Sequence, residues 1–144
     1  RNYLRHRILP VLRERWPAAS ATLSRSAAHC AEAAQLLSAL AQQDMAALSG
    51  DGAETLPVAG LAGLNPPRRR NLLRHWIASR GATVPSAAVL ARVEQDVLAS
   101  RVDAQPCVRF GQYAIRRYRD SIHLTTPAPE PPPGSDHPRQ YPTQ

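Results

Sequence analysis

Apolar residues recur at helical spacing over most of the first hundred positions of the chain. In residues 1–16 they return every three or four positions, which predicts an amphipathic helix. Pro10 lies inside this pattern and has no backbone N–H, so we expect it to kink the helix, and we expect Pro17 to end it. The apolar positions of this helix are Leu4, Ile8, Val11, Leu12 and Trp16.

Residues 20–48 contain neither proline nor glycine and are rich in alanine and leucine. They predict the longest helix of the chain, on the order of 40 Å at 1.5 Å per residue. A narrow stripe of alanine and leucine would let a partner helix approach closely. The run from Ser49 to Gly52 is rich in turn residues and is expected to end this helix.

Two shorter helices are expected before residue 100. Asn65 followed by Pro66 is typical of a helix start, with Asn as the N-cap and Pro in the first helical position. Gly81 should end this helix, and Ser86 should start the next one. The expected buried positions are Leu72, Leu73, Trp76 and Ile77 in the first helix, and Val89, Leu90, Val93, Val97 and Leu98 in the second.

After Pro106 the pattern changes to short β-prone runs, at 107–110, 113–118 and 121–124, which predict an antiparallel meander. The expected fold is therefore mainly α, of the α+β class: a helical domain of about four helices with a small antiparallel β-meander at its C-terminal end. Residues 127–144 hold half of the chain's 14 prolines and few apolar residues. We expect them to form a linker or a disordered tail.

The chain is strongly basic, and all of its 18 basic residues are arginine, against 11 acids. The absence of lysine excludes a lysine nucleophile or Schiff base from this chain. A net charge of +7 suits a polyanionic partner, because cations that neutralise phosphates release counterions. A solvated cationic surface without a partner would have the same net charge.

The arginines gather in two clusters. The first lies in a stretch without acids, residues 55–93, and three of its members fall in the first turn of a predicted helix, where the helix dipole disfavours cations. The second alternates with Tyr113 and Tyr118 on predicted strands, a combination that can bind phosphates and stack on bases. A solvated basic face, or tyrosines that cover the edge of the core, would explain the same patterns. The candidate RNA-binding residues are Arg68, Arg69, Arg70, Arg74, Arg109, Arg116, Arg117 and Arg119.

No motif for catalysis or metal binding is present. The chain has no phosphate-binding glycine loop, and its five histidines are scattered. Cys30 and Cys107 are too few and too distant for a zinc site, so we expect two buried thiols of a cytosolic protein. No apolar run is long enough for a membrane span, and we expect a soluble, cytoplasmic protein. The helical pattern already present at Arg1 indicates a piece of a longer protein.

Several segments together resemble the tRNA(Ile)-lysidine synthetase family over roughly residues 1–124. They are R-N-x-L-R-x-x-I-x-P-x-L at the start, Arg68 to Ile77, Pro85-Ser86, Asp103-Ala104-x-Pro106 and Ile115-Arg116-Arg117-Tyr118. The resemblance implies an enzyme that uses ATP to adenylate C2 of cytidine 34 in a tRNA(Ile) with a CAU anticodon, after which lysine displaces AMP. The family's Ser-Gly-Gly-x-Asp-Ser loop is absent from this chain, so ATP and Mg²⁺ would bind elsewhere in the parent, and no catalytic residue or cofactor is expected here.

The resemblance also implies a division of the chain. Residues 1–16 would be a linker helix from the catalytic domain, with Arg1, Asn2 and Arg5 facing that domain; residues 17–126 would be the substrate-specificity, tRNA-binding domain; 127–144 would be the tail. Expected partners are tRNA(Ile), the parent's catalytic and second C-terminal domains and, for the parent, a second copy in a homodimer; no membrane is expected. The main alternative is a helical scaffold that orients neighbouring domains without touching nucleic acid. A free-standing DNA-binding protein is a weaker one, because no recognition-helix pair with a tight glycine turn is apparent.

Overall fold

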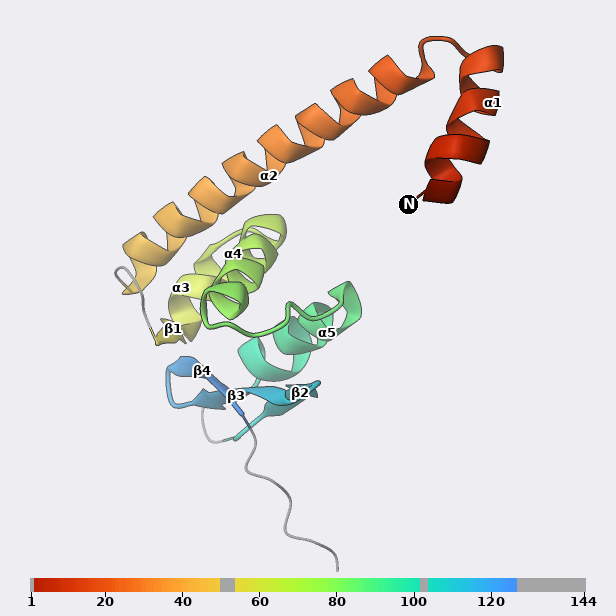
Figure 1. Ribbon diagram of the computed structural model, residues 1–144. Coiled ribbons are helices and arrows are strands. Elements are labelled where there is room, and N and C mark those ends of the chain that lie inside the picture. Colours follow the sequence, from red (N-terminus) through yellow and green to blue (C-terminus); the bar gives the residue numbers. More distant parts are fainter. Residues whose placement is uncertain (1, 50–53, 102–103, 127–144) are drawn as a thin grey trace, which may run out of the picture.

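Helices form most of the chain before residue 100, and a small sheet follows (Figure 1). The computed structural model describes residues 2–49, 54–101 and 104–126. In chain order the elements are η1 (Leu4–Ile8), α1 (Leu9–Arg15), α2 (Ala19–Ser49), β1 (Thr55–Pro57), α3 (Val58–Gly63), α4 (Pro66–Ser79), α5 (Ala87–Arg92), η2 (Val93–Leu98), β2 (Cys107–Phe110), β3 (Tyr113–Tyr118) and β4 (Ser121–Thr125).

The expected disturbance at Pro10 takes the form of a change in helix type. The segment η1 is a π-helix, in which the N–H of Leu9 donates to the carbonyl of Leu4, five residues back. Pro10 cannot donate to any carbonyl, and α1 continues from there as an ordinary α-helix up to Arg15. The helix α2 begins and ends within one residue of its predicted bounds.

The long helix α2 extends away from the rest of the molecule, and α1 lies beside its far end (Figure 1). Only three residues of α2 are buried, Ala41, Asp44 and Met45, all close to its C-terminal end, where α4 packs against it. The expected close helix partner therefore covers only this end. Cys30 is exposed in the middle of α2 and Cys107 is half-buried, so the expectation of two buried thiols was wrong. None of the helices in the described ranges is long and apolar enough to span a bilayer.

The predicted starts of α4 and α5 are confirmed. Asn65 Oδ1 accepts a hydrogen bond from the N–H of Arg68 at 3.1 Å, and Ser86 Oγ accepts one from the N–H of Val89 at 3.4 Å. Gly81, after α4, and Gly111, in the β2–β3 turn, have positive φ angles of 72° and 52°, which glycine adopts without steric cost.

The three predicted strands pair as an antiparallel meander, which confirms the α+β class, but the sheet has a fourth strand. Its order is β1-β4-β3-β2, and β1 pairs antiparallel with β4, Leu56 opposite Ile122. No strand is predicted at this segment, because three residues that include a proline show no strand periodicity. Pro57 is tolerated because β1 is an edge strand.

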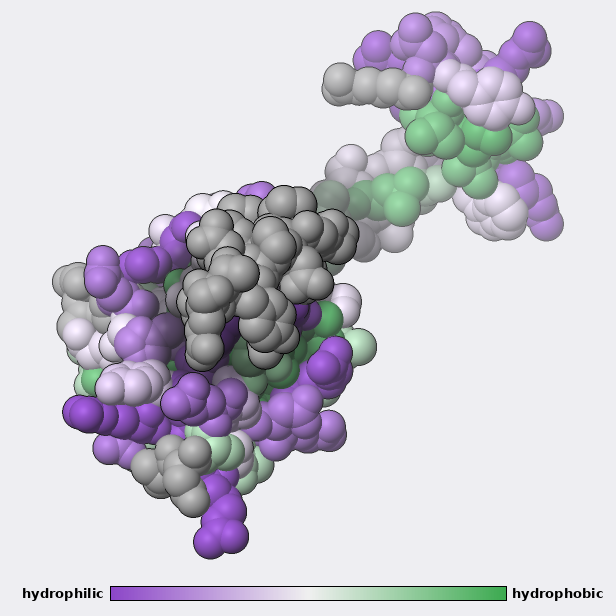
Figure 2. Space-filling model, turned by 90° about the horizontal axis from the view of Figure 1, so that it is seen from below, coloured by the Kyte–Doolittle hydropathy of each residue, from purple (hydrophilic) through white to green (hydrophobic). Residues whose placement is uncertain are grey.

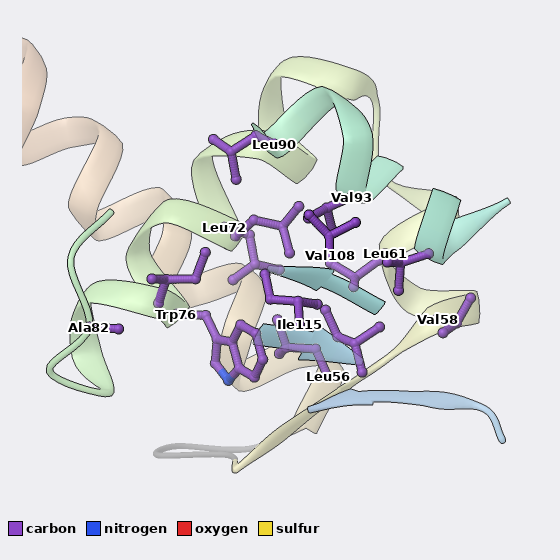
Figure 3. Close-up of a cluster of buried hydrophobic side chains, with 14 of the residues drawn as sticks. Leu56, Val58, Leu61, Leu72, Trp76, Ala82, Leu90, Val93, Val108 and Ile115 are labelled. Atoms are coloured by element: carbon purple, nitrogen blue, oxygen red, sulfur yellow. The ribbon is translucent and has the colours of Figure 1, made fainter. Parts of the chain in front are cut away.

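One face of the sheet and the helices α4, α5 and η2 enclose the hydrophobic core (Figure 3). Register places Val108, Ile115 and Ile122 on the same inner face, and each is fully buried. Against them lie the predicted apolar faces of the helices, with these side chains fully buried: Leu72, Leu73, Trp76, Ile77, Leu90, Val93 and Val97. No helix of the described ranges covers the opposite face of the sheet (Figure 1).

Polar contacts hold α2 to α4 beside this core. The carboxylate of Asp44, only 2% exposed, accepts hydrogen bonds from Arg68 Nε at 2.8 and 2.9 Å and from Nη2 at 2.5 Å. This hydrogen bond and the negative charge of Asp44 raise the pKa of Arg68 above its ordinary value. Asn71 Nδ2 donates to the carbonyl of Leu37 at 2.7 Å, about two helical turns before Asp44 on α2. The docking of α2 thus depends on a buried carboxylate.

Replacement of Asp44 with alanine should loosen α2 from α4, because Arg68 then loses the buried carboxylate that joins the two helices. We expect Tm to fall by about 5 °C and amide hydrogen exchange to quicken in the last two turns of α2. The neighbouring Gln43 is exposed on the same helix, so Gln43→Ala is the matched control and should change neither quantity. Equal exchange rates in the two variants would contradict this role for Asp44.

Candidate nucleic-acid interface

The arginine triplet at the start of α4 is engaged inside the chain. Arg68 binds Asp44, as described above. Arg69 Nε donates to the carbonyl of Leu61 at 2.8 Å, and its Nη2 donates to the carbonyl of Leu64 at 2.8 Å. Arg70 Nη1 donates to Glu94 Oε2 at 3.2 Å, and Arg69 Nη1 lies 3.7 Å from Glu94 Oε1.

These contacts explain why three cations are tolerated where the helix dipole is positive. The acids that compensate them, Asp44 and Glu94, come from α2 and η2 and are both largely buried. The triplet therefore has a structural role in the fold, and its contact with RNA stays a prediction. Arg74, one turn further along α4, is exposed and has no hydrogen-bond or ion-pair partner in the described part of the chain.

Strand alternation divides the second arginine cluster between the two faces of the sheet. Arg109, opposite Ala114, and Arg116, opposite His123, lie on the outer face. Arg117, their neighbour in the sequence, faces inward and is 7% exposed. Its Nε donates to the carbonyl of Arg119 at 2.9 Å and its Nη1 to that of Ser100 at 2.7 Å. Arg117 thus lies on the face opposite to Arg109 and Arg116, because a strand points successive side chains to opposite faces, and its contact with RNA stays a prediction.

Aromatic rings lie beside the outer arginines. Tyr118, 56% exposed, and His123 meet edge to face, with ring centroids 6.3 Å apart. The guanidinium of Arg119 lies 5.2 Å from the centroid of the Tyr118 ring, in cation–π geometry. Arg119 has a positive φ of 54° in the β3–β4 turn, a conformation that an arginine adopts at some cost. No sequence pattern distinguished His123, the third residue of β4, from the other scattered histidines.

The outer sheet face, defined here as Arg109, Arg116, Tyr118, Arg119 and His123, is positively charged. In the described residues no carboxylate lies within 4 Å of any of its three guanidinium groups. Figure 2 looks at the sheet end of the molecule, where hydrophilic side chains gather on the body. Guanidinium groups bind phosphates, and exposed rings stack on unpaired bases. The face suits single-stranded or looped RNA.

The N-terminal helix carries a different surface, distant from the sheet (Figure 1). Asn2 and Arg5, both exposed, line a shallow cavity of about 330 Å³ together with Leu4 and Leu9. Tyr3 and Val11 are 71% and 64% exposed, and Figure 2 shows apolar side chains gathered at this end. Arg1, Asp103 and the tail 127–144 lie outside the described residues. Among those that are described, no three His, Cys, Asp or Glu residues come together as a metal site would require.

Comparison with known proteins identifies the body of the molecule. Residues 56–123, from β1 to β4, match the model of the TilS substrate binding domain. The tRNA(Ile)-lysidine synthase of Coxiella burnetii is 43% identical over 125 residues, which cover 87% of this chain and 27% of that protein. Those of Methylococcus capsulatus and Pectobacterium atrosepticum are 44% and 45% identical, covering 89% and 86% of this chain and 29% and 28% of theirs.

The chain thus spans less than a third of the length of the curated relatives that it matches. The matched domain, residues 56–123, contains the outer sheet face and α4. The alignments with the relatives are longer than this domain and reach 129 residues. Because residues 56–123 match the domain and 86% to 89% of the chain is similar to these enzymes, the chain belongs to the tRNA(Ile)-lysidine synthase family.

Proposed function

We propose that this chain binds tRNA(Ile) as the substrate-specificity part of a tRNA(Ile)-lysidine synthase, with the outer sheet face as its RNA contact. The parent would use ATP and Mg²⁺, held outside this chain, to attach lysine to C2 of cytidine 34 in the CAU anticodon. A tRNA substrate implies the cytoplasm. The observation that supports RNA binding here is the grouping of Arg109, Arg116 and Arg119 on one exposed face without a carboxylate partner in the described residues.

Different groups on the outer sheet face would bind different parts of the RNA. Arg109 and Arg116 would neutralise phosphates and fix the position of the RNA. Tyr118 and His123 would stack on bases, with Arg119 holding the Tyr118 ring by cation–π attraction. Arg74 is a further candidate phosphate contact on α4.

The remaining parts would serve the parent's architecture. Residues 1–16 would be the linker helix, with Arg1, Asn2 and Arg5 facing the catalytic domain; residues 17–126 would be the specificity domain; 127–144 would lead to the next domain. One observation favours the alternative of a scaffold that orients domains without RNA contact: four of the candidate arginines are engaged inside the chain, namely Arg68, Arg69, Arg70 and Arg117.

Arg116 and Arg117 are neighbours in the sequence but lie on opposite faces of the sheet, so they give a matched test of the RNA contact. Arg116→Ala, combined with Arg109→Ala, should make the negative slope of log K against log salt for tRNA(Ile) shallower by about 2, because two phosphate contacts are lost. The melting temperature should stay unchanged, since both side chains are exposed. Filter binding over a series of salt concentrations, together with thermal unfolding, measures both quantities.

Arg117→Ala should behave in the opposite way. Its removal leaves the carbonyls of Ser100 and Arg119 without their donor, at a cost of about 2 kcal/mol in unfolding free energy. The salt slope of the folded protein should remain that of the wild type. Unchanged tRNA affinity in the Arg109, Arg116 double variant would favour the scaffold.

The N-terminal surface is tested in the full-length parent. Arg5 is exposed and has no carboxylate partner in the described residues, so Arg5→Ala should lower lysidine formation about tenfold while Tm stays the same. Arg7→Ala, on the same π-helix and also exposed, is the matched control and should be nearly neutral. An early-melting Arg5→Ala enzyme with normal turnover per folded molecule would make Arg5 structural instead.

The chain by itself should make no lysidine and catalyse no tRNA-dependent exchange between ATP and pyrophosphate, because its sequence lacks the family's phosphate-binding loop. Radiolabelled pyrophosphate exchange with the purified chain measures this. Exchange above that of a no-protein control would show that a nucleotide site had been overlooked.

A further inference from the structure

A pocket of about 470 Å³ lies between the loop that precedes α5 and the turn that joins β2 to β3. The loop contributes Thr83, Val84 and Ser86, the strands contribute Phe110 and Tyr113, and the turn between them contributes Gln112. Its volume is within the range of sites for small molecules. It lies beside β2, which is an edge strand of the sheet.

Two aromatic rings and the aliphatic side chains of Val84, Pro85 and Val89 line it. The rings of Phe110 and Tyr113 have centroids 6.0 Å apart and are tilted by 34°, and both are half-buried against the core. Tyr113 Oη accepts a hydrogen bond from Gln112 Nε2 at 3.1 Å and donates to the carbonyl of Gly81 at 3.4 Å. Its ring is therefore held in place before any ligand arrives. Val84, 40% exposed, faces the pocket from the loop.

The rim offers hydrogen-bonding groups of both kinds. Gln112 Oε1 has no donor in the described part of the chain and can accept. Ser86 Oγ accepts from Val89, but its own hydrogen has no acceptor there and can be donated. A flat aromatic ligand with donors and acceptors along its edge would match this lining, and an unpaired nucleobase has that chemistry.

We propose that this pocket holds one unstacked base of the bound RNA, an inference that rests on the proposed function. Arg109 precedes Phe110 on the edge strand and lies on its outer side, opposite Ala114. A strand of RNA whose phosphate lies on Arg109 can therefore turn around the edge of β2 and place the adjoining base between Phe110 and Val84. The outer sheet face would bind the backbone, and the pocket would bind a base.

The test fills the pocket without disturbing the outer face. In Val84→Phe the added ring occupies the space between the loop and Phe110, and affinity for a tRNA(Ile) transcript should fall about tenfold, as expected when one stacked base is lost. Gln112→Ala should lower affinity less, and Gln95→Ala, an exposed glutamine on η2, should change nothing. Unchanged melting temperatures would exclude misfolding.

Chemical probing of 2′-hydroxyl groups in the transcript identifies the base. With the wild type, one unpaired nucleotide should change reactivity, and with Val84→Phe it should return to its free value while the rest of the footprint persists. If Val84→Phe binds with wild-type affinity and footprint while the Arg109, Arg116 double variant does not, the pocket proposal is wrong and the proposed function stands. If neither variant alters binding, both are wrong. If the pocket instead binds an apolar side chain of another domain, Val84→Phe would bind the transcript with wild-type affinity and footprint while the Arg109, Arg116 double variant would not.

Discussion

The structure depends on the compensation of positive charge at the first turn of α4. Three consecutive arginines lie where the helix dipole is already positive, with no acid in the turn. Asp44 of α2 pairs with Arg68, and Glu94 of η2 pairs with Arg69 and Arg70. Each carboxylate is largely buried and would be costly without its partner. Since the two acids come from elements on either side, the same contacts place α2 and η2 around α4.

This arrangement determines where the sheet can lie. The helix η2 contacts β2 and β3, and the fully buried side chains of α4 close the other side of the core. One face of the sheet is thereby covered, and strand alternation leaves the other for Arg109 and Arg116. Arg117, on the covered face, joins the sheet to the end of η2 through the carbonyl of Ser100. The basic residues are thus separated into those that build the domain and those that are free to meet a polyanion.

The two surfaces proposed to serve the parent enzyme are far apart in space (Figure 1). The outer sheet face and the neighbouring pocket lie on the body, whereas Asn2 and Arg5 lie at the far end of the arm formed by α1 and α2. In the described residues this arm is attached to the body through α2's last turns. Changes at one surface should therefore leave the stability and geometry of the other intact, so their effects on tRNA binding and on turnover can be separated.

The sequence by itself determined the local structure: the helices, through apolar spacing and the caps Asn65 and Ser86, and the three-stranded meander, through short β-prone runs. These depend on interactions within a few residues. Tertiary structure decided which arginines are free, because the partners of Arg68 and Arg70 lie 24 residues away, in opposite directions. It also decided that β1 is a strand, because β1 is formed by hydrogen bonding to β4. Cys30 is exposed because no other described residue packs over that stretch of α2. These features depend on contacts between residues that are distant in the sequence, so no local sequence pattern predicts them.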